Sequence, residues 1–398
     1  MKRILVIAGG EWQIPLIRSA KSMGHFVVNT NLYADSPGFA YADAHAVVDV
    51  FDITQNIAIA RQYNVDAVVT DQTDIAVRSV AQVAAELQLP GIGVDIAQRF
   101  TSKFLMREYN AQCGFATPQY TTCTSVDEIA AFMAQCNGPV VIKPIANQSS
   151  RGVIKLESND PVSIRDAYAY ANPHTPDGRV IVEEYIGGTE ITVDGIKLND
   201  GNHYCLATSY KDHYTHNPMI AYALWFSQTH PTIDYATLHA QHNELVLRMG
   251  LPFGVTHAEY KYYNGKFYLI EVAARGGGTN ISSHIVPAMS GIDSVQYLLR
   301  MATGEQIQMI HPQYHSQHVV LYFYNFDSGV VSNIAGVEAV NALPGVIKFG
   351  LNIKPGQRIL PPGDDRSRHA FAIVSGASHD QVVARIDQIR ATIQVTYE

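Results

Sequence analysis

The sequence predicts an α/β protein that begins with a wound parallel sheet and continues into lobes in which helices and strands are mixed. Its 398 residues are too many for one ordinary core, at roughly 150 residues per domain, so two or three lobes are expected. Hydrophobic residues make up 47% of the chain and charged residues 16%, a composition that excludes a disordered protein. Over residues 1–95, short apolar runs alternate with helix-length segments, which is typical of βαβ units.

The first lobe is predicted from this alternation of strands and helices. An apolar run at 3–8 ends at Gly9-Gly10 and precedes a helical stretch that reaches Gly24. Further strands are expected at 26–30, 45–50, 65–70 and near 92–93, with a helix over 76–87. The Gly9-Gly10 turn lacks the G-x-G-x-x-G spacing of a pyrophosphate turn, so a dinucleotide site is not predicted.

The next part of the chain mixes predicted helices with short predicted strands. Thr101 can cap a helix that Gly114 closes, and Ser125 and Asp160 can cap two more. Short strands are expected at 140–143, 152–156 and 180–184. This alternation indicates an α+β lobe.

Strands predominate after about residue 190. They are expected at 190–197, 203–210, 319–326, 346–349 and 370–374. A helix is expected over 235–249, and Ser378 begins a capping box that opens the last helix. Asn264-Gly265 is a strong turn dipeptide, so 255–263 should pair with 267–272 as a hairpin.

Charge, cysteine content and hydropathy limit the partners of the chain. Lys and Arg number 28 and Asp and Glu 36, and the net charge of −8 argues against nucleic-acid binding. The four cysteines form no C-x-x-C pair and no zinc spacing, so reduced thiols are expected. No apolar run approaches about 18 residues and no signal peptide is recognised, so we expect a cytoplasmic protein without a membrane partner.

Two polar stretches are candidates for contacts with a nucleotide. A strand that ends in Lys143 precedes a small polar loop at 146–153, whose backbone N–H groups could close over a phosphate. Glu183, Glu184 and Glu190 offer carboxylate oxygens, which accept hydrogen bonds from an amino group or from ribose hydroxyls. An ordinary hairpin loop and a solvated acidic turn are the alternatives.

A pair of carboxylates, Glu259 and Glu271, lies on the predicted hairpin, five and six residues from its turn. The two side chains could face the same side of the sheet. Paired carboxylates without a nearby cysteine suit a hard cation such as Mg²⁺, which takes one or two carboxylates plus phosphate oxygens. The alternative is a pair of charges on a solvated sheet face.

These stretches occur in the order and at the separations of a known nucleotide site. Lys103, Lys143, the loop at 149–153, the run 183–190 and the pair Glu259 and Glu271 together resemble the ATP-grasp superfamily, over nearly the whole chain. The resemblance implies a pre-ATP-grasp domain over 1–95, an ATP-grasp domain over 96–310 and a small C-terminal α+β domain over 311–398. A smaller ATP-lid subdomain is implied at about 115–190, and the tail is similar to the small domain of the biotin carboxylase and purine-biosynthesis branch.

The resemblance implies that this site binds ATP. Lys103 and Lys143 would hold its phosphates, beneath a closing loop formed by Ser149, Ser150, Arg151 and Gly152. This loop departs from the more usual Gly-Ser-x-Gly pattern. Glu183 and the backbone of Tyr185 and Ile186 would contact adenine, with Glu184 beside them, and Glu190 would bind the ribose hydroxyls.

The resemblance also implies a metal site and a catalytic arginine. Glu259 and Glu271 would bind Mg²⁺ or Mn²⁺, and Ala273 stands where many members carry an asparagine that adds a metal contact. Arg275 would stabilise a forming acyl phosphate or orient a substrate carboxylate, because its planar fork suits either task. Arg275 and Lys143 are therefore the candidate catalytic residues.

The activity implied by the resemblance is that of an ATP-dependent ligase forming a carbon–nitrogen bond. A carboxylate attacks the γ-phosphate of ATP, and an amine or similar nucleophile then displaces phosphate from the acyl phosphate. Two alternatives remain open: use of a one-carbon acid such as formate or bicarbonate, and a non-catalytic protein in which ATP regulates partner binding. The substrates are small molecules whose identity is open, and the resemblance favours a homodimer.

Two further features could belong to the site. The polar segment 209–218 is expected to be a loop, either a lid in which Lys211 reaches a phosphate or a substrate carboxylate, or a plain solvent loop. Among 16 histidines, His257 and His284 flank the expected metal and substrate region. Surface or packing roles are expected for the other histidines.

Overall fold

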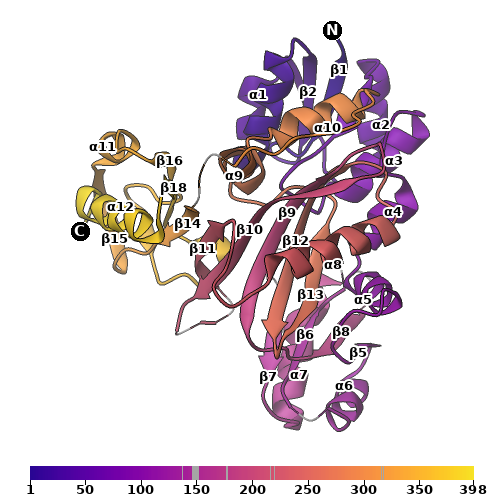
Figure 1. Ribbon diagram of the computed structural model, residues 1–398, viewed down its shortest axis with the longest axis vertical. Helices are drawn as coiled ribbons and strands as arrows, with labels where there is room; N and C mark the ends of the chain where they lie inside the picture. Colours follow the sequence, from indigo (N-terminus) through magenta and orange to yellow (C-terminus); the bar gives the residue numbers. More distant parts are fainter. Residues whose placement is uncertain are drawn as a thin grey trace.

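The computed structural model describes residues 1–136, 138–145, 152–175, 178–215, 217–218, 220–314, 316 and 318–398. The predicted loop residues Ser149, Ser150 and Arg151 therefore lie outside the described residues. Figure 1 shows the first lobe at the top, a small subdomain at the bottom and the C-terminal segment to one side of a long central sheet.

The first lobe is a four-stranded parallel sheet, which confirms the predicted wound α/β start of the chain. Its strands are β1 (Arg3–Ile7), β2 (Phe26–Asn31), β3 (Ala44–Val47) and β4 (Ala67–Val69), in the order β3-β2-β1-β4. The helices are α1 (Ile14–Ser22), α2 (Ile53–Gln62), α3 (Val77–Glu86) and α4 (Val94–Arg99), with short 3-10 turns at Glu11–Gln13 and Pro37–Tyr41. The strand expected near 92–93 is wrong, because Gly93 adopts a φ of 87° and directly precedes α4.

An antiparallel sheet forms the small subdomain. Its strands are β5 (Tyr120–Cys123), β6 (Val140–Pro144), β7 (Ile154–Leu156) and β8 (Val180–Glu184), in the order β5-β8-β6-β7. Helix α5 (Lys103–Gln112) leads into it, and α6 (Val126–Met133), α7 (Pro161–Ala171) and a 3-10 turn at Asn172–His174 accompany its strands. Ile129, Ile142 and Ile164 are buried between the two helices and the sheet.

The helix caps of this region follow the sequence at two of three positions. Ser125 and Asp160 are the N-caps of α6 and α7, as predicted. The N-cap of α5 is Ser102 instead of Thr101. The prediction for Thr101 is wrong because its hydroxyl donates to the Ala97 carbonyl, at 2.9 Å, within the last turn of α4.

The central sheet has eight antiparallel strands and carries most of the candidate site. Their order is β13-β12-β9-β10-β11-β14-β18-β16. The bounds are β9 (Thr189–Lys197), β10 (His203–His213), β11 (Ala221–Ser227), β12 (Gly254–Tyr263), β13 (Lys266–Ala273), β14 (His318–Tyr324), β16 (Val346–Leu351) and β18 (Ala370–Gly376). Strand β10 pairs with β11 as far as His213, so the loop expected over 209–218 is wrong for residues 209–213.

The hairpin at Asn264-Gly265 forms as predicted. Both turn residues have positive φ angles, 48° and 74°, as a primed two-residue turn requires. In the register of β12 and β13, Glu259 stands directly opposite Glu271. Directly opposite residues of an antiparallel pair share one face of the sheet, so the expected pairing of the two carboxylates is confirmed.

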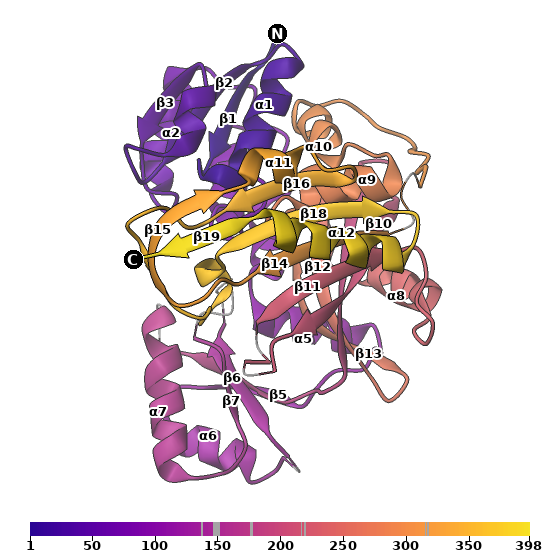
Figure 2. The same ribbon diagram turned by 90° about the vertical axis from the view of Figure 1, so that its left-hand side faces the viewer.

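The C-terminal segment continues the central sheet and adds a second layer. The layer contains β15 (Gly329–Ala335), β17 (Arg358–Ile359) and β19 (Gln394–Tyr397). It is accompanied by α11 (Val337–Asn341), α12 (His379–Thr392) and a 3-10 turn at Asp365–Ser367, and Ser378 caps α12 as predicted. Figure 2 shows this layer and α12 in front of the central sheet.

One hydrophobic core joins the first lobe to the rest of the chain. Ile4 of β1, Phe226 of β11 and Phe371 of β18 are buried in it, together with Leu299 of α10 (Ser294–Ala302). A π-helical turn at Ile281–Ile285 and α9 (Val286–Ser290) precede α10, and α8 (Tyr235–Arg248) packs on the central sheet. Among the helices that the structure describes, none combines the length and the apolar character needed to cross a membrane.

Candidate active site

A cavity of about 1020 Å³ opens between the first lobe, the small subdomain, the central sheet and the C-terminal segment. Most of the predicted site residues that the structure describes line it: Lys103, Lys143, Glu183, Glu184, Tyr185, Ile186, Glu190, Glu259, Glu271 and Arg275. Gly152 lies next to the lining residue Val153 and has a φ of 71°, a conformation that favours glycine. Residues far apart in the sequence therefore meet in one cavity.

The two predicted metal carboxylates each contact a lysine in the cavity. Lys211 Nζ lies 2.6 Å from Glu259 Oε1, and Lys103 Nζ lies 2.9 Å from Glu271 Oε2. Burial alone would raise the pKa of Glu259, but Lys211 and His257 lower it to about 2. Glu259 is therefore ionised at neutral pH and can act as an oxygen ligand.

Lys211 also binds the predicted ribose carboxylate. Its Nζ lies 2.6 Å from Glu190 Oε1, while Lys261 Nζ lies 3.0 Å from Glu190 Oε2. The sequence placed Lys211 in a loop, whereas in β10 its side chain bridges two carboxylates of the cavity. Strand alternation was the signal that could have found it, because Ser209, Lys211 and His213 share one face of β10.

Glu183 is held between two cations at the end of β8. Lys143 Nζ lies 2.5 Å from its Oε2, and Arg107 Nε lies 2.7 Å from its Oε1. Both oxygens are therefore engaged, so this carboxylate orients Lys143 whether or not it also reaches adenine. Arg107 was missed in the sequence because nothing local marks a residue of α5 as the partner of a strand 76 positions later.

Burial changes the charge state of Lys143. Desolvation lowers the pKa of Lys143 to about 8, against the opposing attraction of Glu183. A lysine with this pKa is mostly charged at neutral pH but loses its proton readily above it. Lys143 can therefore hold a phosphate at pH 7 and loses that ability as the pH rises.

Arg275 is clamped by a carboxylate from the first lobe. Its Nε and Nη2 lie 3.0 and 2.6 Å from the two oxygens of Asp74, a bidentate pair. The next residue, Gly276, donates its N–H to Asp71 at 2.9 Å, and an added Cβ there would lie 2.3 Å from the Ser282 side chain. The sequence could not reveal the Asp74 contact, because the two residues are 201 positions apart.

His257 lies beside Glu259 on β12. Its Nδ1 is 2.9 Å from Asp194 Oδ1, and its Nε2 is 3.7 Å from Glu259 Oε1. Burial would lower the pKa of His257, but Asp194 and Glu259 raise it to about 9. Ala273 stands opposite His257 across the β12–β13 pair, just as Glu271 stands opposite Glu259. His257 is two residues before Glu259 on β12, so the imidazole lies on the same face of the sheet as the two carboxylates.

The donor set of the cavity fits a hard divalent cation. Glu259 and Glu271 supply oxygen donors from adjacent strands, and both side chains face the cavity. Among the described residues, no three His, Cys, Asp or Glu side chains are already grouped as a metal centre. The two carboxylates would therefore share Mg²⁺ with phosphate oxygens, as that ion commonly requires.

Two family models match this chain. Residues 136–283 match the ATP-grasp domain, and residues 322–398 match the L-amino acid ligase C-terminal domain 2. Residues 136–283 are therefore identified as an ATP-grasp domain. Lys143, Glu183, Glu259, Glu271 and Arg275 all fall within the matched ATP-grasp residues, and the resemblance inferred from the motifs is confirmed.

Several known proteins are similar to this chain. It is 30% identical over 210 residues to a formate-dependent phosphoribosylglycinamide formyltransferase of Erythrobacter litoralis, which covers 51% of this chain and 53% of that protein. The chain spans about half the length of the curated relatives it matches.

Solved structures show the same fold over the whole chain. The L-amino acid ligase of Bacillus licheniformis matches with a TM-score of 0.85 at 21% identity, covering 100% of this chain and 99% of that one. The biotin carboxylase domain of 2-oxoglutarate carboxylase from Hydrogenobacter thermophilus matches with a TM-score of 0.80 at 17% identity, covering 99% and 90%. The predicted fold class is confirmed.

Proposed function

We propose that this chain is an ATP-dependent ligase that activates a carboxylate as an acyl phosphate and transfers the acyl group to an amine. The observation that carries the proposal is the position of Glu259 and Glu271, opposite each other in a cavity that also contains Lys103, Lys143 and Arg275. This combination of two oxygen ligands and several fixed cations suits a metal-bound triphosphate.

The reaction has two steps, and different residues of the cavity assist each one. The substrate carboxylate attacks the γ-phosphorus and ADP leaves; the amine nitrogen then attacks the acyl carbon, and phosphate leaves as the amine loses a proton. Lys103 and Lys143 offset the phosphate charge, and Arg275, held by Asp74, faces the developing charge of the acyl phosphate. A divalent cation on Glu259 and Glu271 would neutralise charge on the phosphate oxygens.

The nucleotide end of the cavity is proposed from the same residues. Glu184, Tyr185 and Ile186 line the end beside Lys143, and Glu190 lies at the start of β9. Adenine would lie against the first three and the ribose hydroxyls against Glu190. This placement is supported by the cavity itself, in which these side chains lie together with Lys103 and Lys143.

Amino acids are the favoured substrate class. Residues 322–398 match a domain of L-amino acid ligases, and that segment contributes Phe323, Leu351 and Arg368 to the cavity. A second candidate, a ligase of formate, is favoured by the 30% identity to a formate-dependent formyltransferase over about half the chain. A homodimer remains a proposal, supported by the dimer of the matched biotin carboxylase domain.

A phosphate-release assay tests the proposal. The purified chain with Mg-ATP should release phosphate when paired amino acids are added, and formate or bicarbonate with an amine should test the second candidate. Lys143→Ala should lose this release. A chain that binds ATP but releases no phosphate with any of these substrates would instead be a non-catalytic ATP-binding protein.

A further inference from the structure

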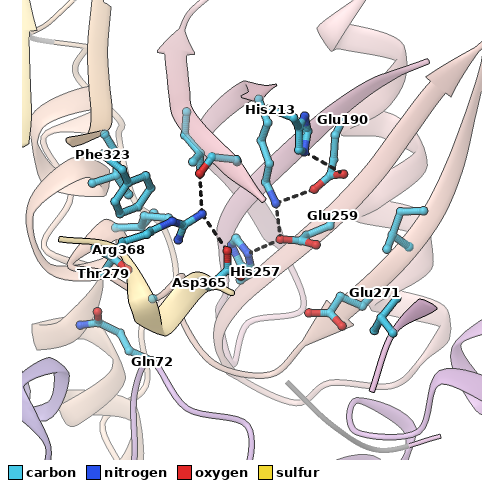
Figure 3. Close-up of a pocket in the computed structure, with 18 of the residues that line it drawn as sticks. Gln72, Glu190, His213, His257, Glu259, Glu271, Thr279, Phe323, Asp365 and Arg368 are labelled. Carbon is cyan, nitrogen blue, oxygen red and sulfur yellow. Dashed lines mark hydrogen bonds and ion pairs between the residues drawn. The ribbon is translucent and has the colours of Figure 1, made fainter. Parts of the chain in front are cut away.

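The cavity has a second compartment away from the metal carboxylates. Figure 3 shows Phe323, Arg368, Thr279 and Gln72 grouped on one side of it, with Glu190 and Glu271 on the other. Arg368 and Phe323 come from the C-terminal segment, Thr279 from the glycine-rich stretch after β13, and Gln72 from the first lobe. The nucleotide proposed above does not account for this side.

Arg368 is a buried cation held in a fixed orientation. Only 9% of the residue is exposed, and its guanidinium carbon lies 3.7 Å from the centre of the Phe323 ring. Nη2 alone makes its polar contacts: 2.7 Å to the Ala221 carbonyl and 2.8 Å to Asp365 Oδ1. Within the described chain, no residue accepts a hydrogen bond from Nη1, so this part of the fork is available to an anionic group.

Asp365 places the opposite charge next to this arginine. It begins the short 3-10 turn that precedes Arg368, and its side chain lines the cavity with 30% exposure. A carboxylate accepts from an ammonium or amine, whereas a guanidinium donates to a carboxylate. The two side chains are in contact, so together they can bind a ligand whose anionic and cationic groups are separated by a single carbon.

Apolar side chains form part of the wall of this compartment, where the polar residues Asn352, Lys354 and Gln357 also line the cavity. Leu321, Phe323, Leu351 and Ile353 line it from the C-terminal segment, and Trp12 lines it from the first lobe. Trp12 also packs edge-on against Phe371, with ring centres 5.8 Å apart, which fixes the indole in place. A ligand with an apolar side chain would be covered by these apolar residues and would lose little by leaving water.

We infer that Arg368 and Asp365 bind the amine substrate, which is an α-amino acid with an apolar side chain. Its α-carboxylate pairs with Arg368, its amino group is directed by Asp365, and its side chain lies against Trp12 and Ile353. This inference rests on the proposed function, since it names the amine substrate of the same cavity. Arg368 and Asp365 thereby become the residues that decide which amines are accepted.

A binding experiment with matched amines tests the inference. L-Leucine, L-leucinamide, which lacks the carboxylate, and O-phosphoethanolamine, which carries a phosphate instead, are titrated calorimetrically into the MgADP-loaded full chain. We expect L-leucine to bind most tightly. Arg368→Met should weaken L-leucine on the order of 10- to 100-fold, the range for a charged hydrogen-bonded pair, and leave L-leucinamide unchanged.

Two further variants keep the test decisive. Arg358→Met removes an exposed arginine of the same segment that does not line the cavity, and it should leave L-leucine binding unchanged. Asp365→Asn, a milder change at a more exposed site, should weaken L-leucine but not 4-methylpentanoate, which has no amine. If Arg368→Met fails to fold, as judged by circular dichroism, Asp365→Asn tests the same inference in its place.

Three outcomes would overturn the inference: equal affinity for L-leucine and L-leucinamide, tighter Arg368-dependent binding of O-phosphoethanolamine, or no binding of L-leucine. Phosphate release separates this failure from that of the proposed function. Release with simple amines but no preference for amino acids would leave the ligase proposal intact. Arg368-dependent L-leucine binding without release from any substrate pair would instead contradict the ligase proposal alone.

Discussion

The charged residues of the cavity are arranged as pairs of opposite sign. Lys103 contacts Glu271, Lys143 contacts Glu183, and Lys211 contacts Glu259. Breaking a buried pair by removing one partner is costly, because the other charge is left without compensation. The pairs therefore hold each lysine in the cavity before a polyanion binds, and phosphate oxygens would then compete with the carboxylates for these lysines.

The lowered pKa of Lys143 predicts a pH limit on ATP use. The ammonium form is present below a pKa of about 8 and is lost as the pH rises through it, so kcat/KM for ATP should fall above about pH 8. Lys143→Arg, which stays charged, should remove this fall even if its activity is lower. A wild-type profile of kcat/KM that is flat from pH 7 to about 9.5 would contradict the assignment.

Removing one of the two proposed metal carboxylates should affect catalysis far more than folding. Glu271→Gln keeps the shape of the side chain but removes a charge from the cation site, so ligation should fall by about 100-fold or more. Calorimetry should also show weaker Mg²⁺-dependent ADP binding. Glu244→Gln, on the exposed face of α8, is the matched control and should retain activity. Normal Mg²⁺-dependent binding by Glu271→Gln would rule out the metal role.

Helix α8 covers a group of buried histidines behind the site. His203 Nδ1 lies 2.7 Å from Asn243 Oδ1, and its Nε2 lies 2.8 Å from Thr256 Oγ1. His242 packs against His203 with ring centres 5.0 Å apart. Burial lowers the pKa of His203 to about 4 and that of His242 well below its usual value. Both rings are therefore neutral in the fold.

The lowered pKa of these histidines predicts that the free energy of unfolding falls at acid pH. Unfolded histidine binds a proton near pH 6.5, whereas folded His203 does so only near pH 4, so the unfolded chain binds more protons between these values. The free energy of unfolding should be unaffected above pH 7 and fall as the pH drops below 6.5, by about 3 kcal/mol for His203 when integrated. Urea unfolding between pH 7 and 5 measures the slope, and His203→Gln should make it shallower.

One loop of the first lobe, after β4, holds the glycine-rich stretch that carries Arg275. Asp71 accepts the Gly276 N–H, Gln72 accepts the Asn280 N–H, and Asp74 holds Arg275. Each contact joins the end of β4 to the glycine-rich stretch after β13, about 200 positions away. At the scale of the whole molecule, the position of Arg275, the proposed catalytic arginine, therefore depends on how the first lobe packs against the central sheet.

Asp74→Asn tests this dependence. The amide cannot accept two charge-assisted hydrogen bonds from Arg275, so the guanidinium should lose its fixed orientation and kcat should fall roughly 10- to 100-fold. The Kd for MgADP should stay unchanged, because Arg275 is assigned to the acyl group. Asp66→Asn, which removes the charge of a half-buried carboxylate in the same lobe that does not line the cavity, is the control. An unchanged kcat in Asp74→Asn would show that Arg275 needs no such clamp.

Local rules explain what could be predicted from the sequence. The Asn264-Gly265 turn forms a hairpin because both residues adopt positive φ angles. Glu259 and Glu271 lie at nearly the same distance from it, and a register shift between Glu259 and Tyr260 takes up the difference of one residue, so that the two carboxylates pair. The alternation of strands and helices predicted the parallel first lobe, because each strand and helix is recognised from residues that are neighbours in the chain. The order of the charged motifs was enough to indicate the ATP-grasp superfamily.

Only the tertiary structure decided the partners of those charges. No sequence motif marks Arg107, Asp74 or Arg368 as part of the site. Arg107 and Asp74 each contact a charged residue from a distant segment, and Arg368 lines a cavity that distant segments form together. Residues 209–213 were expected in a loop, and they became a strand because β11 pairs with them along their length, while β9 also pairs with Ser209 and Tyr210. Backbone geometry follows from neighbours along the chain, whereas ion pairing and burial depend on which segments meet when the lobes assemble.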